Sequence, residues 1–370
     1  MNWLHKKTVF YGIPFILLVL SLLFVYNNHS LYDRPIAKVT EVEVEESTEL
    51  VDVHDNTDQR FNQAIVAEIK NGEQKGALIH LENTYTLSGA YDHEYSTGNE
   101  LFVWIDPQEG DDELTGSITD VKRDKYVMIV GWLFIATLLL VGKKQGLFSV
   151  ISLLINALLL SYALDIYINT QNSSLVLICG VSAILFTVLT LLLVNGANEK
   201  SYSAMIATII STVALMAIMS FFLWFAPEGG LRYEEMGFLT RPYEVVFLAG
   251  VLIGSLGAVM DVAISMSASI FGIYEENKTI SLKALKASGM EVGKDIMGTM
   301  TNILFFAYIS GSIPSLLLYI KNNSPLGFTL SMNLSLELAR ALAGGIGIVL
   351  AIPIGLYTSL FFINRKKVRQ

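Results

Sequence analysis

Long apolar stretches alternate with short polar segments along most of the chain. Each stretch approaches the ~20 residues that an α-helix needs to cross a bilayer. The second and third stretches are short and the sixth is long. They lie at about 8–26, 126–142, 147–164, 174–194, 204–226, 243–271, 299–320 and 341–363. This pattern predicts an α-helical polytopic membrane bundle of about eight transmembrane helices, and a hydrophobic content of 52% agrees with it.

The polar segment between the first two stretches has a different period. Residues 37–44 and 64–69 alternate between apolar and polar side chains, residues 77–82 form another short strand segment after a glycine turn region, and residues 101–105 are aromatic and β-branched. Turn residues such as Gly72 and Gly98 separate these strands. The segment therefore predicts a small β-rich barrel domain of OB or SH3-like size. The expected domains are an N-terminal signal-anchor helix at 1–26, an acidic extracytoplasmic β domain at 27–125 and a seven-helix transmembrane domain at 126–370.

Charge is distributed unevenly. Residues 27–125 contain 22 acidic and 8 basic side chains, whereas the whole chain has a net charge of −9. An acidic external domain argues against nucleic acid as a partner.

Basic residues predict the orientation in the membrane. Cytoplasmic loops carry an excess of Lys and Arg. If the N-terminus is inside, the short outer loops contain only Arg232, Arg241 and Lys321, with Arg340 at a helix edge. The short inner segments contain Lys6, Lys7, Lys143, Lys144, Lys200, Lys278, Lys283, Lys286, Lys294, Arg365, Lys366, Lys367 and Arg369. We therefore expect a multi-pass protein of the cell membrane with both termini cytoplasmic and residues 27–125 outside.

Asp261 is the most informative residue because it interrupts the sixth apolar stretch. Gly254, Gly257, Asp261 and Ser265 recur at steps of three and four, which puts them on one helix face. A carboxylate at membrane depth is costly and usually marks a pathway. We expect Asp261 and Ser265 to bind an ion or substrate. The alternative is that the helix passes the membrane edge and Asp261 is solvated there.

The seventh and eighth stretches supply further candidates. Asn302 and Thr301 are expected to join Asp261 in the site, although Asn302 could instead hold two helices together. Glycines at helical spacing are expected to serve gating or packing, because small residues let helices approach closely. These are Gly254, Gly257, Gly298, Gly344 and Gly347. Glu337 lies one turn before Arg340, at the spacing of an ion pair.

A polar group is expected at the cytoplasmic face. Asn195, Asn198 and Lys200 lie at the inner end of the fourth stretch, and Asp295 lies before the seventh. A plain solvated turn explains the first three residues equally well.

The sequence offers little support for the active-site motifs that are common in soluble enzymes. All five histidines precede the second stretch, so no histidine-based zinc motif can form in the bundle. The segment 289–295 has too few residues between its glycines, and no Ser or Thr after its lysine, to be a phosphate loop. We expect no enzyme activity, no cofactor and no metal site.

Two segments resemble a known family. Gly257-Ala-Val-Met-Asp261-Val-Ala-Ile-Ser265 and Gly293-Lys-Asp295-Ile-Met-Gly298-Thr-Met-Thr301-Asn302 are similar to the YibE/F-like family of bacterial multi-spanning membrane proteins. The order of anchor, β domain and helical bundle extends this resemblance over most of the chain. The resemblance implies the topology and the choice of residues, and it implies no particular chemistry.

These observations favour a transporter or permease-like protein with a polar intramembrane site around Asp261 and Asn302. The expected partners are the lipid bilayer and a small solute or ion. The main alternative is a non-transporting scaffold or sensor, whose β domain binds an envelope protein or whose chain forms a homo-oligomer. An intramembrane enzyme is a third alternative, for which the sequence offers no matched nucleophile and base.

Overall fold

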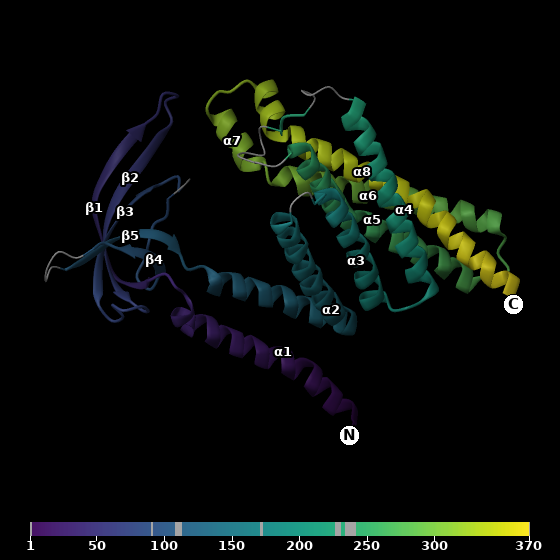
Figure 1. Cartoon of the computed structure of the whole chain (residues 1–370), viewed down its shortest axis with the longest axis horizontal. Helices are drawn as coiled ribbons and strands as arrows, with labels where there is room; N and C mark the ends of the chain where they lie inside the picture. The colour runs from purple at the N-terminus through teal and green to yellow at the C-terminus, as the bar shows by residue number, and fades with distance from the viewer. Residues whose placement is uncertain are drawn as a thin grey trace. The chain divides into compact units, whose positions relative to one another are not determined.

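The chain forms two compact units, Met1–Thr137 and Leu138–Gln370. The structure is a computed structural model and describes residues 2–89, 92–107, 113–170, 173–225, 231–233 and 242–369. The first unit contains a small β-barrel, and the second is helical (Figure 1).

Five strands make the barrel: β1 (Ile36–Val51), β2 (Thr57–Ile69), β3 (Leu78–Thr86), β4 (Glu100–Ile105) and β5 (Leu114–Val121). Their order is β1-β2-β3-β5-β4, and β1 closes the barrel by pairing antiparallel with both β2 and β4. The β3–β5 pair is parallel. Alternation puts one side of each strand inside, so that Ile65, Ala67 and Ile69 are fully buried. The predicted small barrel is confirmed.

One strand of the barrel was not expected from the sequence. β5 is rich in small and polar residues, with Thr115, Gly116, Ser117 and Thr119 along it, and this composition reads as a loop. Its place is set by pairing with β3 and β4 instead. Most of the acidic segment before it, residues 108–112, lies outside the described residues.

A buried charge cluster joins the barrel to the helices at its ends. Lys122 follows β5 and is 1% exposed. Its ammonium donates to the Val25 carbonyl at 3.0 Å and to Asp124 Oδ1 at 2.9 Å. It also lies 3.4 Å from Glu100 Oε2 of β4, and Lys125 approaches the other Glu100 oxygen at 3.6 Å. The cluster therefore connects β4 to the end of the first helix and the start of the second.

Neutral donors complete the hydrogen bonding of Asp124. Asn28 Nδ2 and the Tyr32 hydroxyl both donate to Asp124 Oδ2, each at 3.0 Å. Burial, reinforced by the Asp124 carboxylate, raises the pKa of Tyr32, so the phenol keeps its proton and remains a donor. Because a buried charge is tolerated only when it is paired, this cluster depends on every member.

Replacing Lys122 with Met tests the cluster. The variant keeps the side-chain length but leaves Glu100 and Asp124 without their shared cation, which costs about 3–5 kcal/mol. We expect faster amide hydrogen exchange in β4 and β5, measured by mass spectrometry on the whole chain. The control is Lys75→Met, at an exposed lysine of the β2–β3 turn. Equal exchange in the two variants would contradict the proposed role of Lys122.

Eight α-helices are defined in the described residues, most of them long. They are α1 (Asn2–Asn27), α2 (Asp124–Asn169), α3 (Leu175–Asn195), α4 (Glu199–Phe225), α5 (Tyr243–Glu276), α6 (Leu282–Ser310), α7 (Ile313–Lys321) and α8 (Leu326–Arg369). Six helices of the described chain are long and apolar enough to cross a membrane. The α6–α7 pair, bent by 56°, adds a seventh span if the pair counts as one.

Three of the expected spans are shaped differently from a separate, straight helix. The second and third apolar stretches form the single helix α2, which is broken at Lys143, where φ is 49° and ψ is −121°. The seventh stretch is interrupted between α6 and α7. Both breaks divide long apolar segments into shorter helical pieces.

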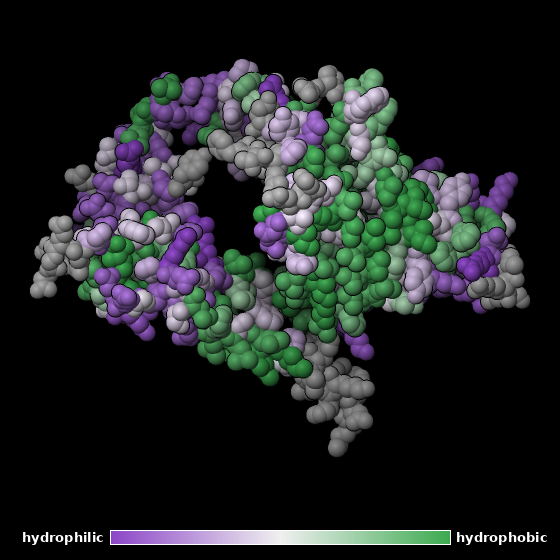
Figure 2. Space-filling view, viewed as in Figure 1, coloured by the Kyte–Doolittle hydropathy of each residue, from purple (hydrophilic) through white to green (hydrophobic). Residues whose placement is uncertain are grey.

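The second unit is built around α5. This helix packs against α3, α4, α6 and α8, and its Val251, Val259, Val262 and Met266 are fully buried. Apolar side chains cover the middle of the visible helical surface, and hydrophilic ones gather toward its ends (Figure 2). Many of them are exposed, including Leu177, Val213, Phe221 and Phe306. An apolar core together with an apolar exterior is the arrangement expected of a membrane-embedded bundle.

Candidate functional site

The two faces of α5 differ in composition. One face carries Val259, Val262, Met266 and Ile270, which form a core with α6 and α8. The other carries the predicted stripe, of which Gly254, Gly257 and Asp261 are exposed and Ser265 is half-buried. The stripe is therefore at the open side of the bundle's central helix.

Asp261 lies near the middle of α5. It is 18 residues after Tyr243, so about 27 Å of helix precedes it. Because about 27 Å is close to the ~30 Å thickness of a hydrocarbon core, the alternative in which the helix passes the membrane edge and Asp261 is solvated there stays open. Its carboxylate has no hydrogen bond or ion pair with any of the described residues. A proton, a cation or a bound molecule would compensate its charge.

Asn302 and Thr301 form no hydrogen bond with Asp261 among the described residues. Thr301 faces α8, where a Cβ added at Gly345 would lie 3.4 Å from its methyl group. The Thr301 hydroxyl is buried and has no hydrogen-bond partner in the structure. Asn302, one residue later on α6, is exposed, and no hydrogen bond joins it to Asp261 within the described chain. Their assignment as ligands remains a prediction.

The five predicted packing glycines fall into two groups. A Cβ at Gly254 would overlap the Tyr308 hydroxyl, and one at Gly344 would overlap Leu304. A Cβ at Gly347 would lie 2.9 Å from Val259. Gly257 and Gly298 have nothing within 4 Å of an added Cβ. Three positions therefore lie at close helix contacts, where a larger residue would displace a neighbouring side chain, and two border open space.

A second polar group lies where α5, α6 and α8 meet. Arg340 Nη1 donates to Glu337 Oε1, which confirms the expected ion pair, and the guanidinium lies 5.7 Å from the Phe247 ring centroid. A Cβ added at Gly250 would lie 3.8 Å from Arg340 Nε, and one added a turn later at Gly254 would overlap the Tyr308 hydroxyl, so both side chains reach one face of α5. The Tyr308 hydroxyl and Arg340 Nε are both buried and have no hydrogen-bond partner in the part of the chain that the structure describes. Tyr308 was missed in the sequence, where a lone tyrosine in an apolar helix gives no signal.

A third polar group connects three helices through serine hydroxyls. Ser203 of α4, Ser267 of α5 and Ser359 of α8 are each 0% exposed. Their Oγ atoms lie 3.0 Å (203–359), 3.2 Å (267–359) and 3.3 Å (203–267) apart. The Ser203 hydroxyl also donates to Thr358 Oγ1 at 3.3 Å, so the hydroxyls of this group are hydrogen-bonded within the protein and stabilise helix packing. Small residues at helical spacing were the only sequence signal for it.

The predicted cytoplasmic-face group is partly a helix cap. Asn198 Oδ1 accepts from the Ser201 amide at 3.0 Å, and its Nδ2 donates to the Asn195 carbonyl at 2.7 Å. These are the bonds of an N-cap at the start of α4. Lys200 forms an exposed ion pair with Glu275 at 3.3 Å. Asp295 is exposed on α6. The solvated-turn interpretation therefore fits Asn195 and Asn198 better than a ligand site does.

Comparison with known families decides the identity. The family described as "YibE/F-like protein" matches residues 130–365, and the "YibE/F family N-terminal domain" matches residues 30–121. The chain belongs to the YibE/F-like family. The resemblance seen in the sequence is thereby confirmed. No curated protein and no solved structure matches this YibE/F-like chain, so its chemistry must be argued from its own residues.

The two groups of glycines lead to a paired test on α5. We expect Gly254→Ala to lower the melting temperature, because the new methyl group displaces Tyr308, an overpacking cost of about 1–3 kcal/mol. Gly257→Ala is the matched control, since its methyl group enters open space and alanine favours helix. Melting of both variants in detergent measures the difference. Equal melting temperatures would show that the Gly254–Tyr308 contact carries no packing role.

Proposed function

We propose that this YibE/F-like protein transports a small solute or ion across the membrane, with Asp261 as the residue that binds a proton or cation. The observation that carries the proposal is the unpartnered carboxylate in the middle of α5. A central Asp costs about 2.5–3.5 kcal/mol on insertion, and a purely structural helix avoids that cost with a neutral side chain.

The surroundings of Asp261 suit a carboxylate that takes up and releases a proton or cation. Gly254 and Gly257 precede it on the same face, and both are exposed. Side chains of this size leave the carboxylate accessible to water or a solute. The opposite face of α5 is fully packed, so the helix itself is fixed while its polar face stays open. Transport is then driven by an ion gradient or by a separate partner, because the chain contains no phosphate loop.

The proposed topology has eight spans, both termini in the cytoplasm and residues 27–125 outside. Support comes from the break at Lys143, which divides the 46-residue α2 into two pieces, each near spanning length. The α6–α7 pair then supplies one further span. The excess of basic residues in the inner loops agrees with this orientation.

Cysteine accessibility tests this topology. Cys179 is the single cysteine, so replacing it gives a cysteine-free background. Single cysteines at positions 47, 171 and 235 should react with an impermeant maleimide in intact cells. Cysteines at positions 145, 200 and 283 should react only after the membrane is opened. Labelling of position 145 or 283 in intact cells would contradict the proposed topology.

Asp261→Asn tests the proposed function. The amide keeps the shape but cannot carry a charge, so the variant should insert, melt like the wild type and lose ion flux. Purified protein is reconstituted into vesicles containing a pH-sensitive dye, and proton flux is followed under gradients of Na⁺ or K⁺. Glu276→Gln, at the exposed end of the same helix, is the control and should retain the flux.

Two results would count against Asp261 as the transport residue. Unfolding of the Asp261→Asn protein would favour a helix-locking role for the carboxylate. A folded variant with full flux would remove Asp261 from the transport site.

The scaffold or sensor alternative is supported by one feature of the barrel. A cavity of about 380 Å³ lies beside β2 and β3, and it is lined by Glu45, Glu82 and Asp106 together with His80. This acidic lining suits a cationic partner rather than the membrane surface. Under this alternative, neutralising these carboxylates abolishes partner binding, and Asp261→Asn has no effect.

A further inference from the structure

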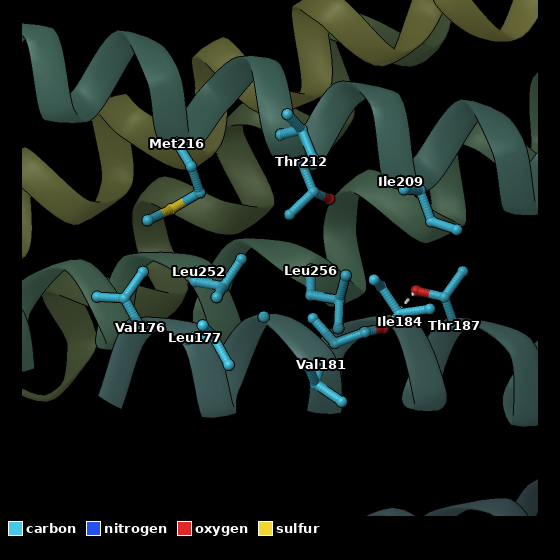
Figure 3. A pocket seen from close by; sticks show the side chains of 13 residues that line it. Val176, Leu177, Val181, Ile184, Thr187, Ile209, Thr212, Met216, Leu252 and Leu256 are labelled. Carbon is cyan, nitrogen blue, oxygen red and sulfur yellow. Dashed lines mark hydrogen bonds between the residues drawn. The ribbon is translucent and has the colours of Figure 1, made fainter. Parts of the chain in front are cut away.

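A membrane-facing cavity lies between α3, α4 and α5 (Figure 3). Its volume is about 340 Å³, which is at the lower end of the range for small-molecule sites. Val176, Gly180 and Ile184 line it from α3, Ile209 and Met216 from α4, and Leu256 from α5. Gly180 widens the cavity, since an added Cβ there would meet nothing within 4 Å.

Two hydroxyls interrupt this apolar lining, and they behave differently. Thr187 donates to the Ala183 carbonyl one turn earlier at 2.8 Å, as hydroxyls in apolar helices commonly do. Thr208 and Ser211 of α4 do the same at 2.8 and 2.7 Å. Thr212 does not: its residue is only 6% exposed, and its Oγ1 is buried without a hydrogen-bond partner. The Thr212 side chain points from α4 into the cavity (Figure 3).

The depth of Thr212 limits what can pair with it. Thr212 is the central residue of α4, so about 20 Å of helix lies on each side. The hydrocarbon core of a bilayer is about 30 Å thick, which puts the ester groups of phospholipids about 15 Å from this hydroxyl. A charged group at this depth is strongly disfavoured. The missing partner is therefore an uncharged oxygen carried into the core by an apolar molecule.

We propose that this cavity binds an uncharged, elongated, membrane-dissolved molecule with one hydrogen-bonding oxygen, such as a long-chain alcohol or ketone. Its oxygen accepts a hydrogen bond from Thr212, and its chain fills the space beside Gly180. The bond satisfies a buried hydroxyl that the helices leave unpaired. None of the lining residues belongs to the group around Asp261, so the proposal does not depend on transport.

Photolabelling of the full-length protein in lipid nanodiscs tests this proposal. The probe is dodecanol with a diazirine in its chain, and adducts are mapped by mass spectrometry. We expect saturable labelling concentrated at residues 176–187 and 209–216. A phosphatidylcholine with the same diazirine in its acyl chain should label the outer faces of the helices without this concentration.

Matched variants separate the hydroxyl from the shape of the cavity. Thr212→Val removes the unpaired hydroxyl at nearly constant shape and should weaken dodecanol binding about fivefold. Thr187→Val lines the same cavity but removes a hydroxyl that is already paired, and it should leave binding unchanged. Gly180→Leu fills the cavity and should abolish saturable labelling, whereas Gly131→Leu, at an exposed position of α2, should not. Melting temperatures confirm that each variant is folded.

Three outcomes would overturn the proposal. The first is dodecanol labelling spread evenly along α3 and α4. The second is equal labelling of the cavity by the phosphatidylcholine probe, which would identify an ordinary lipid chain as the occupant. The third is a folded Thr212→Val protein that binds dodecanol as the wild type does.

Discussion

Hydrogen bonding inside an apolar environment is the constraint on which the helical unit depends. Hydrocarbon offers no partner for a polar side chain, so the helices must supply one. Thr187, Thr208 and Ser211 satisfy their hydroxyls on the preceding turn of their own helices. Ser203, Ser267 and Ser359 satisfy one another across three helices. Packing of α4, α5 and α8 is thereby combined with hydrogen bonds among these serines.

The two proposals rest on polar side chains that do not follow this rule. Asp261 has no partner among the described residues, and the Thr212 hydroxyl is buried without one. The barrel follows the opposite principle at Lys122, whose ammonium is fully enclosed by the Val25 carbonyl and by the carboxylates of Glu100 and Asp124. A satisfied buried charge fixes structure, whereas an unsatisfied group at membrane depth indicates that a ligand, proton or ion completes it.

Much of the fold could be predicted from the sequence, because hydrophobic period is a local property. The sixth apolar stretch became α5, and four of the five strands followed the alternating segments. β5 was missed because its polar residues are held by pairing with β3 and β4, which is not a local property. The candidate functional site was harder to predict from the sequence for the same reason. Helical spacing put Gly254 and Asp261 on one face, but where Asn302, Tyr308 and Arg340 lie relative to that face depends on how α6 and α8 pack.

The central claim is that the Asp261 carboxylate changes its proton or cation occupancy in the working protein. Infrared difference spectroscopy of the protein in lipid, recorded between two pH values and with and without Na⁺ or K⁺, measures this directly. The account predicts a carboxyl band that changes with these conditions in the wild type, persists in Glu276→Gln and is absent from Asp261→Asn. A difference spectrum that is identical in the wild type and in folded Asp261→Asn would contradict it.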